Sequence, residues 1–479
     1  MEKPSLTKRS WARRLFLQRA SSGLGAMALG ILLNKQRSVA ANEGPAERFR
    51  YPMPYWRPKA KRVIFLCMAG GPSHLETFDY RPKLKSMDGQ PMPSAFTQGQ
   101  PIAQLQGQTL RCLGPLAKFR KHGQSGQEIS EFLPHISKMA DEICIVRSLQ
   151  TDQINHDPAH TVMNTGTSIP GNPSMGSWIT YGLGSESDNL PGFIVLTSEG
   201  GRNPQPISSR QWHTGFLPSR YQGVEFRSKG SAVHYVNSPD GVDRIRQRDV
   251  VEAINALNRN RNKNVTNPEI DTRISQYELA FQMQTSVPGL MDLSDETEES
   301  LRLYGVRNVD GSYAANCLLA RRLAERGVRF IQLYHRGWDH HGDLVSYMNT
   351  CCGLTDRPTA ALLQDLNRRG ILEDTLVVWG GEFGRTPMFQ GKGKQPGRDH
   401  HIRGFSMWLA GGGVRGGLTY GSTDELGYNA IENVVHVNDL HATMLHLLGI
   451  DHERFTYPYQ GRDFRLTDVG GKVAHGILA

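Results

Sequence analysis

Val328 to Asp343 reads VRFIQLYHRGWDHHGD, and this stretch decides the fold and the site expected of the chain. Its first half is mostly apolar, interrupted only by Arg329 and Gln332, which predicts a largely buried strand. Its second half gathers two carboxylates and two imidazoles within five residues, beside Gly337 and Gly342. Open α/β sheets bind ligands at the carboxyl ends of their strands, so this position favours a functional site.

Such a group of polar side chains is costly to bury unless a partner compensates it, and a metal ion is the simplest partner for acids and histidines. The alternative interpretation is a solvated surface loop rich in histidine. Four further segments of similar composition favour the metal. They are Gly70–His74, His156–Gly166, Gly380–Pro387 and Arg398–His401.

Other apolar runs predict the rest of the sheet. Residues 62–68, 142–149, 193–197, 376–379 and 405–410 are expected to be buried strands, with amphipathic helices between several of them. This alternation predicts an α/β fold with a mostly parallel central sheet and helices on both faces. From about residue 240 to 305 charged amphipathic segments dominate, which predicts a helical insertion.

The first 40 residues are typical of an export signal. Arg13-Arg14 precede an apolar stretch from Ala20 to Leu33, and small residues follow at 38–41, as in a twin-arginine signal. The stretch is short and glycine-rich for a membrane span, so membrane contact is expected only if the signal stays uncleaved. We therefore expect a mature domain of residues 41–479 in the periplasm or cell envelope.

Removing the signal changes the charge of the protein. Eight of the 55 Lys and Arg residues and one of the 46 Asp and Glu residues lie in the first 40, which leaves 47 basic and 45 acidic side chains. A net charge of about +2 gives no reason to expect nucleic-acid binding. The six cysteines show no Cys-x-x-Cys spacing, so neither a zinc ribbon nor a redox dithiol is indicated.

Eight of the 17 histidines lie in the five segments named above: His74, His156, His160, His335, His340, His341, His400 and His401. His156 and His160 are four apart, so a helix would place both on one face, for metal binding or for ordinary polar packing. Glu382 is a candidate ligand and Arg385 a candidate oxyanion partner, although a structural salt bridge between them is the alternative. Mixed histidine and carboxylate ligation suits Zn²⁺ or Mn²⁺ better than Ca²⁺ or Mg²⁺.

These motifs resemble the alkaline phosphatase/sulfatase superfamily, and most closely an exported sulfatase-like branch of unknown function. The resemblance rests on GGPSH at 70–74, GWDHH at 337–341, EFGRTP at 382–387 and the Asp399-His400 pair, and it covers roughly residues 60 to 465. It implies an alkaline-phosphatase-like sheet with its metal site at the carboxyl ends of the strands.

The chain departs from the sulfatase pattern at the nucleophile. Sulfatases carry a Cys-x-Pro-Ser-Arg segment whose Cys becomes formylglycine, but here His156 stands at the Cys position and His160 at the Arg position. A mechanism without formylglycine is therefore expected. Gly70-Gly71 replaces the Asp pair of the first strand, whereas Glu382 keeps a carboxylate in the later motif.

The sequence therefore predicts an exported metal-dependent hydrolase of phosphate or sulfate esters, acting on an anionic ester such as a sulfated or phosphorylated glycan. Arg385 is expected to stabilise developing charge, and His156 to be a ligand, a general acid/base or a nucleophile, in that order. His160 is a further catalytic candidate; Thr161 and Thr165 are weaker nucleophile candidates. The expected metal ligands are Asp339, His341, Glu382 and His400, with His74 and Asp399 as further candidates.

Two alternatives remain open. The first is a binding or scaffold protein of the cell envelope that kept the fold and lost the chemistry, which the missing Asp pair and nucleophile favour. The second is a membrane-tethered member of a larger envelope complex, which requires an uncleaved signal.

Overall fold

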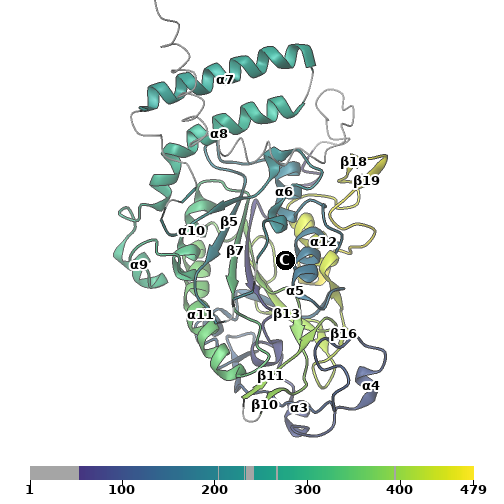
Figure 1. Cartoon of the computed structure of the whole chain (residues 1–479). Coiled ribbons are helices and arrows are strands. Elements are labelled where there is room, and N and C mark those ends of the chain that lie inside the picture. The colour runs from purple at the N-terminus through teal and green to yellow at the C-terminus, as the bar shows by residue number, and fades with distance from the viewer. Residues whose placement is uncertain are drawn as a thin grey trace, which may run out of the picture.

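The computed structural model describes residues 53–202, 204–205, 207–230, 232–233, 242–265, 268–392 and 395–479. The predicted export signal lies outside them. Within this part of the chain a nine-stranded sheet runs through the centre, and helices cover both of its faces (Figure 1). The predicted α/β class, with a mostly parallel central sheet, is confirmed.

The strand order in the sheet is β14-β4-β13-β8-β1-β7-β5-β6, and β17 also pairs with β4. All pairings are parallel except those of β13, which runs antiparallel to both β4 and β8. The strands are β1 (Arg62–Ala69), β4 (Ile143–Gln150), β5 (Phe193–Ser198), β6 (Val224–Phe226), β7 (Phe330–Arg336), β8 (Thr375–Gly380), β13 (Phe405–Ala410), β14 (Leu418–Tyr420) and β17 (Val435–His436).

Two separate cores lie on the two faces of the sheet. Side chains alternate between the faces along a strand, so Leu66 of β1 packs in one core and Phe65 in the other. The first core includes residues of α10 (Tyr313–Glu325) and α11 (Leu344–Arg368). The second includes residues of α5 (His156–Thr165), α6 (Met175–Leu183) and α12 (Val437–Leu447). Burial on both faces explains why β1 is a continuous apolar run.

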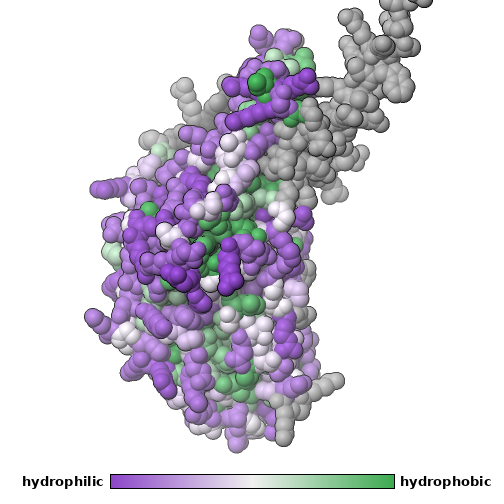
Figure 2. All heavy atoms as spheres, turned by 90° about the vertical axis from the view of Figure 1, so that its left-hand side faces the viewer, coloured by the Kyte–Doolittle hydropathy of each residue, from purple (hydrophilic) through white to green (hydrophobic). Residues whose placement is uncertain are grey.

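The predicted helical insertion corresponds to α7 (Arg244–Val265), α8 (Pro268–Met291) and α9 (Glu298–Tyr304). Figure 1 shows α7 and α8 as a helical pair beyond one end of the sheet. The face that carries α9 and α11 is mostly hydrophilic, with hydrophobic side chains between the polar ones (Figure 2). In the described ranges, no helix is long and apolar enough to cross a membrane.

Short elements complete the described chain. They are α3 (Pro82–Ser86), α4 (Ser94–Thr97), β2 (Phe119–His122), β3 (Gln127–Ser130), β9 (Gly384–Arg385), β10 (Gln390–Lys392), β11 (Gln395–Gly397), β12 (His400–His401), β15 (Ser422–Thr423), β16 (Ala430–Glu432), β18 (Tyr457–Tyr459) and β19 (Arg462–Phe464), with 3₁₀ turns at 74–76, 136–139, 209–212, 219–221 and 475–477.

Three adjacent parallel strands bring the predicted motifs together. In the order β8-β1-β7, Ala69 pairs with Arg336 and Cys67 pairs with Gly380, so the three strands end at the same edge. The loops that follow them are therefore neighbours. Gly70, with φ +120°, allows the first loop to approach the β7 loop closely, because a Cβ there would lie 2.5 Å from the backbone nitrogen of Asp339.

Candidate metal centre

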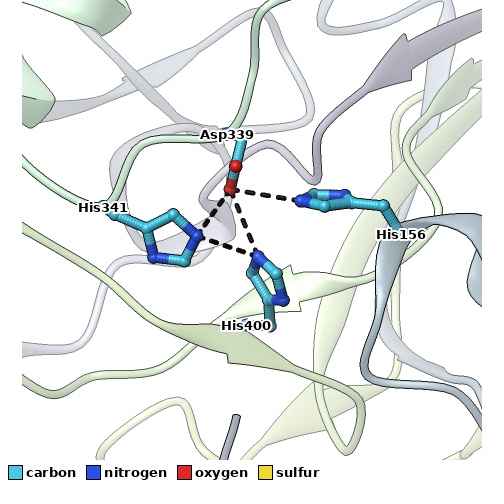
Figure 3. A group of neighbouring side chains, drawn as sticks. All are labelled: His156, Asp339, His341 and His400. Atoms are coloured by element: carbon cyan, nitrogen blue, oxygen red, sulfur yellow. Dashed lines mark hydrogen bonds and ion pairs between the residues drawn. The ribbon is translucent and has the colours of Figure 1, made fainter. Parts of the chain in front are cut away.

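Four side chains converge beside the carboxyl ends of β1, β7 and β8, with one ligand atom of each inside a span of 4.8 Å (Figure 3). We call His156, Asp339, His341 and His400 the four-residue cluster. His156 begins α5, Asp339 and His341 lie in the loop after β7, and His400 lies on β12. Three segments far apart in sequence thus meet at one point.

Asp339 lies at the centre of the cluster. Its Oδ1 atom is 2.8 Å from Nε2 of His341, 3.2 Å from Nε2 of His400 and 3.3 Å from Nε2 of His156. For a tetrahedral zinc ion with bond lengths of about 2.0 Å, neighbouring ligand atoms lie about 3.3 Å apart. The observed spacing therefore matches the edges of a coordination shell.

All three histidines point Nε2 into the cluster and hydrogen-bond outward through Nδ1. The acceptors for His156, His341 and His400 are, in turn, Glu382 Oε1 at 2.6 Å, Gln390 Oε1 at 2.6 Å and the carbonyl oxygen of Ile154 at 2.8 Å. Because these groups accept, each Nδ1 must donate, and in the neutral ring Nε2 then keeps a free lone pair. This is the tautomer that binds a metal through Nε2.

The two closest ring nitrogens of the cluster need a cation between them. Nε2 of His341 lies 3.0 Å from Nε2 of His400. Two lone pairs at this distance repel each other unless a proton or a metal ion separates them. The cluster of three imidazoles and one carboxylate can therefore hold a metal ion, as the residue types predicted.

The charged groups of the cluster shift one another's pKa values. Burial raises the pKa of Asp339, but hydrogen bonds with the three histidines and the charge of Arg385 outweigh it and hold the pKa well below the usual range. Burial lowers the pKa of His156, yet its bonds with Asp339 and Glu382 raise it to about 9. For His400, burial prevails and lowers the pKa to about 4. Metal binding would therefore release a proton from His156.

Glu382 was predicted to be a metal ligand, and the structure places it beside the four-residue cluster, in contact with His156. Its carboxylate is fully buried and lies outside the four-residue cluster. Both of its oxygens accept from the backbone N–H of Gly70, at 3.0 and 3.1 Å, and Oε1 also accepts from His156. Burial raises its pKa, but the charge of His160 and the bond with His156 lower it to about 2. Glu382 therefore orients the imidazole of His156.

Arg385 was predicted to stabilise developing charge, and the structure places its guanidinium in the interior beside Asp339. It donates to Asp339 Oδ1 at 2.7 Å, to the carbonyl oxygen of Gly71 at 2.9 Å and to that of Gly70. A further donor reaches the carbonyl of Arg398 at 3.2 Å. Arg385 therefore fixes Asp339 against the backbone at Gly70–Gly71 and at Arg398.

His74 and His160, two further candidates from the sequence, are both buried in the interior. His74 is fully buried, and its Nε2 lies 2.9 Å from the carbonyl oxygen of Gly427. His160 is fully buried behind Glu382, with Nε2 3.4 Å from Oε1. Neither belongs to the four-residue cluster. The helical spacing of His156 and His160 thus places one ring in the cluster and the other beneath it.

The structure also shows the hydrogen bonds of the two threonine candidates and of Asp399. The hydroxyl groups of Thr161 and Thr165 donate to backbone carbonyls of their own helix at 2.8 Å, so neither is free as a nucleophile. Asp399 is fully buried, and its Oδ2 accepts from the backbone N–H groups of Gln104 and Leu105 at 2.7 and 2.9 Å. Asp399 therefore fastens a loop beside the cluster rather than binding the ion.

Three glutamines contact the cluster, and the sequence did not predict them. Gln390 accepts from His341, Gln205 donates to Asp339 Oδ2 at 2.7 Å, and Nε2 of Gln104 lies 3.2 Å from Nε2 of His341. Glutamine is common on surfaces and these residues belong to no motif, so no sequence signal distinguished them.

The cluster is open to solvent on one side. The side chains of His341 and His156 keep 23% and 16% of their surface exposed, whereas those of Asp339 and His400 keep 9% and 5%. A ligand can therefore reach the cluster past His341 and His156. Of the roles predicted for His156, its position fits that of a metal ligand best.

Comparison with known proteins places the chain among proteins without an established reaction. A family model described as "Protein of unknown function (DUF1501)" matches residues 60–478. No curated protein matches the chain.

The similar solved structures are sulfatases, alkaline phosphatases and related proteins. They include the PsFucS1 sulfatase from Pseudoalteromonas sp., at 13% identity over 88% of this chain and 72% of that chain, with a TM-score of 0.35. The lipoteichoic acid synthase LtaP from Listeria monocytogenes shows 11% identity over 87% and 76%, with a TM-score of 0.33. A mutant of TAB5 alkaline phosphatase shows 10% identity over 82% and 98%, with a TM-score of 0.33. The neighbours belong to the predicted superfamily, but similarity this low carries no argument about chemistry.

Proposed function

The chain belongs to the DUF1501 family, whose function is unknown, and we propose from the site itself that this protein is a metal-dependent hydrolase of phosphate or sulfate esters. The proposal depends on one observation above all. Three imidazoles, each held by an outward hydrogen bond from Nδ1, aim Nε2 at one carboxylate oxygen from distances of 2.8 to 3.3 Å.

The donor set fits a divalent transition metal. His156, His341, His400 and Asp339 would hold the ion, and zinc or manganese suits three nitrogens and one oxygen. When bound, such an ion polarises an ester and activates water. The three imidazoles and the carboxylate of Asp339 would be the donors that the chain offers to either ion.

The chain's own residues prepare the site for hydrolysis. Glu382 holds His156 and Arg385 holds Asp339, so the donors need little rearrangement before an ion binds. Hydrolysis forms a bond from the water oxygen to phosphorus or sulfur and breaks the ester bond to the leaving oxygen, which departs with a proton as an alcohol. The open side, beside His341 and His156, is where the ester enters.

The charge of the site favours an anionic substrate. Asp339 and Glu382 carry one negative charge each, Arg385 carries one positive charge, and a divalent ion adds two, so these groups sum to about +1. An anion therefore gains electrostatic energy at the open side. Together with the motif resemblance, this charge supports a phosphate or sulfate ester, and export would give access to a sulfated or phosphorylated glycan.

Metal content and hydrolysis test the proposal directly. After reconstitution, elemental analysis should find about one zinc or manganese per chain, and the protein should cleave an aryl phosphate, an aryl sulfate or a phosphodiester. Asp339→Asn should lose the metal and the activity. Asp343→Asn is the matched control, because Asp343 keeps 39% of its side-chain surface exposed, lies four residues away and adopts a left-handed conformation that Asn tolerates.

Two results would reject the hydrolase. A reconstituted protein without stoichiometric metal would contradict the site itself. A protein that binds the metal but cleaves none of the three substrate classes would be the binding or scaffold protein left open above.

Export is a separate part of the proposal, supported by Arg13-Arg14 and the apolar stretch that follows. Mass spectrometry of the protein from the cell envelope should find a mature N-terminus close to residue 41. Replacing both arginines with lysine should keep the chain in the cytoplasm. An intact N-terminus in the envelope would contradict cleavage and support a membrane tether.

A further inference from the structure

Gln104 lies over the four-residue cluster, although its segment carries no motif. It belongs to the irregular chain between α4 and β2. Its exposed side chain brings Nε2 to within 3.2 Å of Nε2 of His341, a ligand atom of the cluster. Its Oε1 accepts from Nε2 of Gln390 at 3.0 Å. The amide therefore reaches the solvent-exposed side of the site.

A closed ring of hydrogen bonds fixes which end of the amide faces the cluster. His400 is oriented by the carbonyl of Ile154 and by Asp339. The ring begins at His341, whose Nδ1–H donates to Gln390 Oε1 at 2.6 Å. Gln390 must then turn its NH₂ group toward Gln104, which accepts through Oε1. The NH₂ group of Gln104 is thus left to face the cluster, and it cannot be turned without turning its neighbour.

The segment is also tied to the metal ligands through its backbone. The buried carboxylate of Asp399 accepts from the N–H groups of Gln104 and Leu105 through Oδ2, at 2.7 and 2.9 Å. Its other oxygen accepts from the N–H of His400 at 2.9 Å. The backbone of Gln104 is therefore held in a fixed position relative to the ligand His400.

We propose that Gln104 is a substrate-binding residue that donates a hydrogen bond through Nε2 to an oxygen of the anion entering the site, an inference that rests on the proposed metal centre. Its Nε2–H group faces the lone pair of His341 Nε2. An ion at the cluster takes up that lone pair, so the amide loses its acceptor. The next acceptor within reach is an oxygen of a tetrahedral anion on the open side, beside His341 and His156.

Binding of inorganic phosphate to the metal-loaded protein tests this role without turnover. Isothermal titration calorimetry should show phosphate binding about ten-fold weaker in Gln104→Ala, the loss expected for one hydrogen bond to a charged group. Gln104→Glu should bind phosphate more weakly still, because its carboxylate repels the anion. Gln106→Ala is the control, since Gln106 is exposed and its amide donates only to the carbonyl of Ile102.

Elemental analysis of every variant separates this proposal from the metal centre. We expect unchanged metal content in Gln104→Ala. The proposal is overturned if Gln104→Ala binds phosphate within two-fold of the wild type, if this variant loses the metal, or if the metal-loaded wild type binds no phosphate. A wild type that takes up no metal is recognised before any titration, and it contradicts the proposed function instead.

Discussion

Glu382→Gln tests whether a residue outside the ligand set prepares the cluster for metal. The substitution keeps the size of the side chain and leaves all four proposed ligands in place. In the wild type, the two carboxylate oxygens receive the N–H of Gly70, at 3.0 and 3.1 Å, and Nδ1–H of His156 at 2.6 Å. Glutamine has one oxygen and one NH₂ group in their place, so its NH₂ group must face one of these two donors.

The magnitude follows from this loss of one acceptor in a fully buried position. If the amide oxygen takes the place of Oε1, it still accepts from His156 and Gly70, but the NH₂ group then lies against the N–H of Gly70; in the opposite orientation the NH₂ group faces Nδ1–H of His156. Either way the NH₂ group meets a buried N–H donor and has lost the acceptor that the carboxylate offered there, which costs about 1–3 kcal/mol of folding stability. Replacing a charged partner that orients a metal ligand weakens metal binding about 10- to 100-fold, or ~1.4–2.7 kcal/mol.

Two measurements on the same samples separate these effects. Urea denaturation of the metal-free proteins gives the stability loss, and competition with a chelator gives the metal affinity. Metal should also stabilise Glu382→Gln less than the wild type, by ~1.4–2.7 kcal/mol at equal free metal. Glu432→Gln, an exposed glutamate that accepts from Ser422, is the matched control. Wild-type metal affinity in Glu382→Gln would refute the role assigned to Glu382.

Three further predictions concern stability. Arg398→Met should cost about 3–5 kcal/mol in urea denaturation, because it leaves Glu76 without its partner in a fully buried ion pair, whereas Arg368→Met at an exposed pair should cost less than about 1 kcal/mol. Burial lowers the pKa of His335 and His441 to about 4, so between pH 6.5 and 4 these rings bind protons in the unfolded chain but not in the folded one. The free energy of unfolding should therefore fall by ~3 kcal/mol for each ring over this pH range. Urea denaturation of His441→Gln should show a smaller fall. Finally, a chelator should lower the melting temperature of metal-loaded wild type in calorimetry and leave that of Asp339→Asn unchanged.

The sheet was predictable because its strands are buried on both faces. Residues 62–68 and 328–333 are nearly continuous apolar runs, and the structure pairs them in parallel at the centre of the sheet. The antiparallel direction of β13 was not predictable in the same way. The apolar pattern of a buried strand is the same for parallel and antiparallel pairing, so the sequence of β13 does not predict its direction.

The site was predictable as a region but not as a set of ligands. Of the eight histidines in the predicted segments, only three enter the cluster in the described part of the chain. His340 and His341 are adjacent, yet the Nε2 atom of His340 lies 2.9 Å from the carbonyl oxygen of Gly337, and its ring is buried. A shift of one residue along the loop separates a candidate ligand from a buried side chain, and the amino-acid composition of the segment does not predict which histidine is which.

The two strand-end carboxylates show what does determine the ligand set. Asp339 follows β7 and Glu382 follows β8, the two strands that flank β1, and the sequence predicted both as ligands. The longer side chain of Glu382 reaches beneath the site, where Gly70 and His156 occupy its oxygens with N–H donors. Asp339 is also held, by Arg385 and Gln205, but its Oδ1 still faces three imidazole nitrogens that have no proton to give when neutral. The ligands of a strand-end site are thus the atoms that still face lone pairs after the fold has made its own hydrogen bonds. Exchanging the two acids, by Asp339→Glu together with Glu382→Asp, leaves the composition unchanged. We expect this exchange to abolish stoichiometric metal binding in elemental analysis.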